Sequence, residues 1–145
     1  MKAGQNSVGV VVPTYNRVGA LMKCLAHLEH QSCMDFEVVV VDDGSMDATP
    51  ARMASYLQSA PFAIRYLRRE NGGPARARNQ AISIIEAPIC LMIGDDIFAS
   101  EGLVEAHLRL HQQRPEEQVA ALGLTSWSTV DQEVTPFMRW LERGA

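Results

Sequence analysis

Four short apolar runs constrain the fold of this chain more than any other feature of its sequence. They lie at residues 8–12, 36–41, 62–67 and 89–93, and each is rich in β-branched or aromatic residues. The runs are continuous rather than alternating, which is typical of strands buried on both faces of a parallel sheet. The runs therefore predict a sheet whose two faces are both covered.

The segments between the runs have helical spacing, as the crossover connections of a parallel sheet require. Residues 18–28 carry one apolar stripe. Three further helices are expected: one with Thr49 as its N-cap and Pro50 as its first residue, one opening at Gly73 and Pro74, and one capped by Ser100. A fifth strand is expected at residues 119–124. This alternation predicts an α/β fold, an open and mostly parallel Rossmann-like sheet with helices on both faces.

Composition limits the partners and the compartment. The chain has 145 residues, enough for one domain, and a formal net charge of −4, which argues against a nucleic-acid partner. The three cysteines, Cys24, Cys33 and Cys90, have no C-x-x-C spacing, so neither a zinc site nor a disulfide framework is expected. No apolar stretch approaches the roughly 18 residues of a membrane span. We therefore expect a cytoplasmic protein.

Polar residues collect directly after each of the four runs. They occupy positions 13–17, 42–45, 70–74 and 94–96. Ligands of open parallel sheets bind beyond the carboxyl ends of the strands, so these side chains are expected to line one site. Gly72 and Gly73, before a helix, are expected to turn backbone N–H groups and a positive helix end toward the same ligand.

Two adjacent acidic pairs are the strongest chemical signals. Asp95 and Asp96 repel each other unless a cation or a donor lies between them, and carboxylate oxygens suit Mg²⁺ or Mn²⁺. A helix N-cap is the structural alternative for this pair. Asp42 and Asp43 after another strand favour a metal or nucleotide site, although a strand-to-helix turn with local hydrogen bonds is the structural alternative for them. Tyr15 offers a flat face to a base, or is simply a half-buried rim tyrosine.

Four sequence blocks resemble the family 2 glycosyltransferases of the GT-A fold. They are VVVPTYNR at 10–17, FEVVVVDDGSMDAT at 36–49, NGGPARARN at 71–79 and IGDD at 93–96. The resemblance runs from about residue 8 to residue 124, and its specificity comes from all four blocks occurring in order. It implies metal-dependent, inverting transfer of a sugar from a nucleoside diphosphate sugar, expected to be a UDP-sugar, to an acceptor hydroxyl. Cell-envelope polysaccharide synthesis is the expected setting.

The resemblance also assigns residues to the site. Those implied for the nucleotide sugar are Pro13, Thr14, Tyr15, Asn16, Arg17, Asp42, Asp43, Arg76, Arg78 and Asp95. Among them, Asp43 or Asp42 is expected to bind the base and Asp95 the ribose, and Arg78, with Arg76 as a second candidate, is expected to contact the nucleotide. Asp96 is the expected ligand of Mg²⁺ or Mn²⁺, with Asp95 as a second candidate. Because Ile93 and Gly94 replace the usual first acid of the D-x-D motif, the division of labour between Asp95 and Asp96 stays open.

The general base of inverting members lies in the second half of the fold. We therefore expect no catalytic residue within residues 1–145, which would form the nucleotide-sugar-binding part of a GT-A domain, truncated before the acceptor-binding half. Such a chain should bind a sugar nucleotide but transfer sugar poorly. The apolar residues Trp127, Phe137, Met138 and Trp140 in the tail have little core to cover them. A peripheral membrane association of a longer protein stays open, as do the acceptor and the oligomeric state.

Two alternatives use the same residue types. A sugar nucleotidyltransferase also needs carboxylates and a metal, but it usually has a glycine-rich loop after the first strand, and here no glycine follows until Gly19. A non-catalytic nucleotide-binding module would explain the missing acid before Asp95. A dehydrogenase is disfavoured because G-x-G-x-x-G does not follow the first strand.

Overall fold

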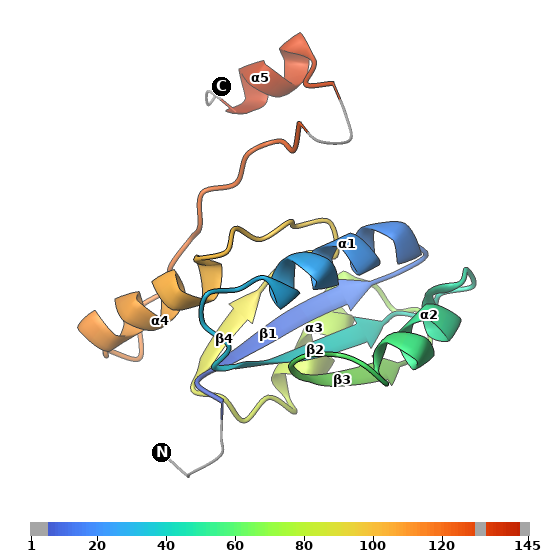
Figure 1. Cartoon of the computed structure of the whole chain (residues 1–145), viewed down its shortest axis with the longest axis horizontal. Coiled ribbons are helices and arrows are strands. Elements are labelled where there is room, and N and C mark those ends of the chain that lie inside the picture. Colours follow the sequence, from blue (N-terminus) through green and yellow to red (C-terminus); the bar gives the residue numbers. More distant parts are fainter. Residues whose placement is uncertain (1–5, 130–132, 143–145) are drawn as a thin grey trace.

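The protein is built around a parallel sheet of four strands (Figure 1). The computed structural model describes residues 6–129 and 133–142. The strands are β1 (Val8–Thr14), β2 (Phe36–Asp42), β3 (Ala63–Arg68) and β4 (Ile89–Met92). They lie in the order β3-β2-β1-β4, and Val8 pairs with Phe36 on one side and with Ile89 on the other. All four apolar runs are therefore strands, with bounds shifted by at most two residues.

Five helices accompany the sheet in the part of the chain that is described. They are α1 (Val18–Glu29), α2 (Thr49–Tyr56), α3 (Pro74–Ile82), α4 (Leu103–Gln113) and α5 (Pro136–Glu142). α1, α2 and α4 pack on one face of the sheet and α3 packs on the other (Figure 1). The expected α/β architecture with helices on both faces is confirmed.

The alternation of side chains along β1 and β2 divides the core into two layers. Val10 and Val38 point toward α1, where Leu25 is fully buried against them. Val11 points the other way, toward Ala77 of α3. Because both sets are shielded from water, the strands could not alternate between apolar and polar residues, which explains the continuous runs in the sequence.

The fifth strand expected at residues 119–124 is wrong. This segment belongs to a tail without regular structure, and Leu122 and Leu124 are each 101% exposed. A strand needs a neighbour to accept and donate its backbone hydrogen bonds, and this segment pairs with no described strand. β4 instead ends the sheet, and Met92 on it is 57% exposed.

Two of the expected helix starts are displaced. Ala48 occupies the N-cap position of α2, and Thr49 is its first residue, with its N–H donating to the Asp47 carboxylate at 2.9 Å. α4 begins at Leu103, with Gly102 rather than Ser100 at its N-cap position. α3 begins at Pro74 as expected. Helix ends are the least certain part of a sequence-based prediction because local capping bonds decide them.

The tail carries α5 away from the sheet (Figure 1). Phe137 and Trp140 on α5 stack on each other, with ring centroids 5.8 Å apart, and both remain exposed. The expectation that these aromatic residues lack a covering core is met for this pair, although residues 130–132 and 143–145 of the tail lie outside the described residues. None of the helices described has both the length and the apolar character that crossing a membrane requires.

Candidate functional site

The loops that follow the four strands meet at the carboxyl edge of the sheet. The Asp43 N–H donates to the Thr14 carbonyl at 2.9 Å, which joins the loops after β1 and β2. The Thr14 hydroxyl donates to Asp95 Oδ2 at 2.7 Å, which joins the loops after β1 and β4. The Asn71 side chain donates to the Asp43 carbonyl at 3.0 Å and adds the loop after β3. The common strand direction therefore gathers the predicted polar residues at one rim.

Asp95 and Asp96 differ sharply in their surroundings. Asp95 is only 4% exposed, and burial raises the pKa of its carboxyl. The hydrogen bond from Thr14 and the charge of Arg17 oppose that rise, whereas the neighbouring Asp96 carboxylate adds to it. The Asp96 side chain is half exposed. One carboxylate is thus fixed within the fold, and the other faces solvent at the rim.

The guanidinium of Arg17 bridges this acidic pair. Its Nη1 lies 3.1 Å from Asp95 Oδ1, and its Nη2 lies 3.0 Å from Asp96 Oδ2. Two adjacent carboxylates need such a cation between them, and the sequence left open which group would supply it. The two carboxylates therefore converge on one positive charge from the loop after β1.

The same geometry tests the fit of a divalent metal. No group of three or more His, Cys, Asp or Glu side chains converges among the residues described, so a site made of protein ligands alone is not formed there. Mg²⁺ and Mn²⁺ at phosphate sites commonly take one or two carboxylates and complete their coordination with phosphate oxygens and water. Asp95 and Asp96, which already share one cation, fit that partial ligand set.

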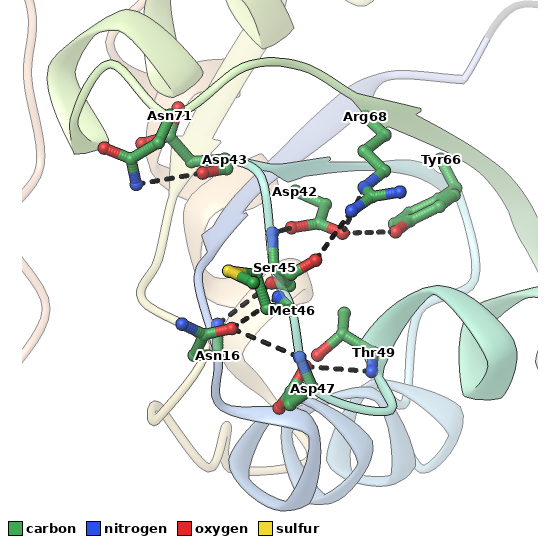
Figure 2. A network of polar contacts seen from close by, with 10 residues as sticks. All are labelled: Asn16, Asp42, Asp43, Ser45, Met46, Asp47, Thr49, Tyr66, Arg68 and Asn71. Carbon is green, nitrogen blue, oxygen red and sulfur yellow. Dashed lines mark hydrogen bonds and ion pairs between the residues drawn. The ribbon is translucent and has the colours of Figure 1, made fainter.

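Asp42 is held inside the fold rather than at the rim (Figure 2). It is fully buried, and its Oδ1 accepts the Ser45 N–H at 2.7 Å. Its Oδ2 accepts the Tyr66 hydroxyl at 2.5 Å and lies 3.8 Å from Arg68 Nε. Burial raises the pKa of Tyr66, and the bond to Asp42 raises it further. Both oxygens of Asp42 thus serve a structural network between β2 and β3.

Asp43 points toward the start of α3. Its carboxylate accepts the Gly73 N–H at 2.7 Å and the Gly72 N–H at 3.0 Å, and lies 3.3 Å from Arg69 Nε. A carboxylate at the N-terminus of a helix is favoured by the helix dipole. The expectation that Gly72 and Gly73 turn their N–H groups toward a ligand is therefore wrong, because the chain's own carboxylate takes both.

Asn16 links the loops after β1 and β2 (Figure 2). Its φ of 52° lies in the left-handed region, which asparagine tolerates better than most residues. Its N–H donates to Ser45 Oγ at 2.9 Å, and its Oδ1 accepts the Met46 N–H at 2.7 Å. Pro13, inside β1, is buried. These contacts give Asn16 a structural role in shaping the rim.

Tyr15, Arg76 and Arg78 are three predicted site residues with exposed or half-buried side chains. Tyr15 follows β1 at the rim and is 44% exposed, so part of the residue is open to solvent. Arg76 is exposed and Arg78 half-buried, both in the first two turns of α3. Within residues 6–129 and 133–142, neither guanidinium has a hydrogen-bond or ion-pair partner. The loop after β1 and the start of α3 therefore offer one partly exposed tyrosine and two unpaired positive charges.

The rim is open rather than enclosed. A hollow among the described residues runs between β4, α4 and the tail, and Asp96 lines it together with Phe98, His107 and Leu122. Tyr15 and Asp43 do not line it. A smaller hollow lies over the loops after β2 and β3, lined by Gly44, Arg68, Arg69, Glu70 and Asn71. The predicted residues thus share one edge of the sheet but not one closed pocket.

The sequence patterns missed two residues that shape this rim. Asp47 accepts the Val18 N–H at 3.1 Å and the Thr49 N–H at 2.9 Å, so it caps both α1 and α2. Gln31 donates to the Ser100 carbonyl at 2.7 Å and accepts the Val104 N–H at 3.0 Å, which ties the loop after Asp96 to α1. An aspartate two residues before a threonine at a helix start was a usable signal for Asp47. Gln31 left no signal, because its partners lie about 70 residues away.

Known proteins resemble this chain in sequence and in fold. The family model described as glycosyl transferase family 2 matches residues 9–136. An uncharacterised glycosyltransferase of Bacillus subtilis (strain 168), YfnE, is 35% identical over 116 residues, which are 79% of this chain and 29% of that protein. S. aureus TarS 1-349, solved in complex with UDP-GlcNAc, matches with a TM-score of 0.67 and 28% identity, covering 74% of this chain and 31% of TarS.

A third match is the structure of a mannosyltransferase. The mannosyltransferase PcManGT from Pyrobaculum calidifontis, solved in complex with GDP-Man and Mn²⁺, matches with a TM-score of 0.64 and 27% identity, covering 70% of this chain and 31% of PcManGT. This chain spans about a third of the length of each of these proteins. The fold corresponds to that of GT-A glycosyltransferases. By the extent of the family match and the order of its strands and loops, the chain belongs to glycosyl transferase family 2.

Proposed function

We propose that this chain forms the donor-binding part of a GT-A glycosyltransferase that uses a nucleoside diphosphate sugar together with Mg²⁺ or Mn²⁺. The observation that carries the proposal is the position of the Asp95–Asp96 pair, which lies beside Thr14 and within reach of Arg17 at the carboxyl edge of the sheet. Two structural relatives support it, since TarS was solved with UDP-GlcNAc, and PcManGT with GDP-Man and Mn²⁺. A UDP-sugar is the donor that we propose.

Each part of the donor has a matching group at the rim. The partly exposed Tyr15 carries an aromatic ring that would stack on the base. Asp43 is the base acceptor in this proposal because Asp42 is fully engaged inside the fold, whereas a carboxylate such as that of Asp43 has about four lone-pair sites and can accept one more bond. Asp95, anchored by Thr14, is assigned to the ribose.

The diphosphate end of the donor needs positive charge. Asp96, together with Asp95 where geometry allows, would hold the metal, which when bound neutralises the charge of the departing diphosphate. Arg78 and Arg76 carry unpaired guanidinium groups at the start of α3 and would bind phosphate oxygens directly. These residues hold and orient the donor, and the electrostatic part of the barrier falls because their charges are already in place.

The transfer step itself needs a group that takes the proton of the acceptor hydroxyl. The family resemblance locates that carboxylate in the second half of the fold, so the proposal assigns no catalytic base to residues 1–145. With inversion, the acceptor attacks the anomeric carbon from the side opposite the diphosphate. We therefore propose that this chain binds the donor and transfers sugar poorly on its own, and that acceptor choice belongs to the remainder of a longer protein.

Isothermal titration calorimetry with UDP-GlcNAc, GDP-Man and UTP, with and without Mn²⁺, tests the proposal. Binding of one diphosphate sugar that strengthens with Mn²⁺ is expected, and Asp96→Asn should weaken it about tenfold or more. Asp35→Asn is the matched control, because Asp35 precedes β2 at the opposite edge of the sheet and its remaining oxygen can still accept the Ser7 N–H. Preference for the triphosphate would favour a nucleotidyltransferase, and no binding at all would refute the proposal.

A further inference from the structure

Arg17 stands where a metal at the acidic pair would have to stand. Its two terminal nitrogens lie 3.1 Å from Asp95 and 3.0 Å from Asp96, one on each carboxylate. This is the fork geometry by which guanidinium groups neutralise paired acids. Both carboxylates therefore already have a counter-cation that belongs to the chain.

The backbone of Arg17 is fixed, but its side chain is not enclosed. Arg17 occupies the N-cap position of α1, and the following N–H, that of Val18, is held by Asp47. The side chain of Arg17 is 51% exposed, and its only described partners are the two carboxylates. It can therefore leave the acidic pair by rotating about its side-chain bonds, without any change in the fold.

A divalent cation at this pair must displace the guanidinium, because the two positive charges would repel each other across the same two carboxylates. Entry of the metal alone therefore breaks two ion pairs and leaves Arg17 without an anion. When the metal enters together with a diphosphate, Arg17 keeps an anionic partner, because phosphate oxygens accept bonds from a guanidinium as readily as carboxylates do.

We propose that Arg17 is the resident counter-cation of Asp95 and Asp96, and that it excludes Mg²⁺ or Mn²⁺ until an anionic diphosphate arrives to accept it. This inference rests on the proposed donor site. It makes the binding of metal and of sugar nucleotide mutually dependent, so each ligand strengthens the binding of the other by the same factor. Arg17 sets that coupling factor.

Titration of the chain with Mn²⁺ alone, followed by the electron paramagnetic resonance signal of free Mn²⁺, tests this inference without any enzymatic readout. Arg17→Gln should bind Mn²⁺ about tenfold more tightly than the unchanged chain, because no guanidinium has to be displaced. Arg17→Lys, which keeps the charge but cannot span both carboxylates, should show a smaller increase in Mn²⁺ affinity. The double variant Arg17→Gln with Asp96→Asn should lose the gain.

Arg65→Gln is the matched control. It also removes one positive charge and one ion pair, the 2.6 Å contact with Glu37, but Arg65 lies on β3, at the opposite edge of the sheet from β4. The Mn²⁺ affinity of the Arg65→Gln variant should equal that of the unchanged chain. Equal Mn²⁺ affinities for the unchanged chain and Arg17→Gln would overturn the inference, as would a gain that persists in the double variant.

Repeating the titration with UDP-GlcNAc present separates the inference from the proposed function. The strengthening of Mn²⁺ binding by the sugar nucleotide should be about tenfold smaller in Arg17→Gln than in the unchanged chain. If Arg17→Gln gains Mn²⁺ affinity but neither protein binds a sugar nucleotide, the proposed function fails, and the exclusion of the cation by Arg17 stands. If both bind the nucleotide and the coupling factors are equal, the inference fails and the proposed function stands.

Discussion

Replacing Asp47 tests how the rim is held in shape. Its carboxylate accepts the Val18 N–H at 3.1 Å and the Thr49 N–H at 2.9 Å, so one side chain caps the N-termini of both α1 and α2. Loss of one cap costs typically about 1 kcal/mol, so Asp47→Ala should lower the free energy of unfolding by about 2 kcal/mol. Asp47→Asn keeps one accepting oxygen and should lose about 1 kcal/mol.

The effect of Asp47 should depend on pH. Slight burial acts to raise the pKa of this carboxyl, but the hydrogen bonds from Thr49 and Val18 outweigh it and hold the pKa below its ordinary value of 3.8. A carboxyl whose pKa is lower in the folded state stabilises the protein fully above its unfolded pKa and loses that contribution as the pH falls through its folded pKa. The difference between the unchanged chain and Asp47→Ala should therefore be complete at pH 7 and shrink below pH 3.8.

Urea denaturation followed by circular dichroism at pH 7 and pH 3 measures both effects. The slope of the free energy against urea should be the same for each variant, because the change exposes no additional surface. A loss below about 0.5 kcal/mol at pH 7 would contradict the double-cap assignment. A loss that is equal at the two pH values would show that the charge of Asp47 plays no part.

Three further predictions concern other parts of the molecule. Tyr66→Phe removes the hydroxyl that donates to the buried Asp42 and should lower the free energy of unfolding, measured by urea denaturation, by about 1.5–3 kcal/mol. An unchanged free energy of unfolding would show that this hydrogen bond does not stabilise the fold. Tyr15→Ala should leave stability unchanged but weaken calorimetric binding of the sugar nucleotide about tenfold, since stacking on one base is worth about 1–3 kcal/mol, and unchanged binding would remove Tyr15 from the site. Burial raises the pKa of Cys24 to about 12, so iodoacetamide at pH 8 should label the exposed Cys90 and spare Cys24 in mass spectrometry, and equal labelling would contradict this packing.

The acidic side chains of the candidate site are already paired with donors of the chain itself, and the site is not an enclosed pocket. Asp43 is neutralised by backbone N–H groups and Arg69, and the Asp95–Asp96 pair by Arg17. Under the proposed function, a free donor molecule would meet a rim whose acids already have partners, and its phosphates would compete for the arginines that pair with those acids. This is the physical basis for expecting metal and nucleotide to bind together.

The sequence by itself determined the sheet and the edge at which the site lies. Continuous β-branched runs such as Phe36–Asp42 are typical of strands with both faces covered, and strands that run in one direction bring their following loops to one rim. The apolar residues at 119–124 carried the same local pattern without becoming a strand, since a strand also needs a partner to pair with.

Only the tertiary structure decided what each acid does. Asp42 and Asp43 are neighbours in the sequence, but successive side chains of an extended chain point to opposite faces. Asp42 is therefore buried against Tyr66, and Asp43 meets the start of α3. The bridge from Arg17 to Asp95 and Asp96 spans nearly 80 residues of sequence. Such contacts arise where the fold brings distant loops together, and no local pattern of residues specifies them.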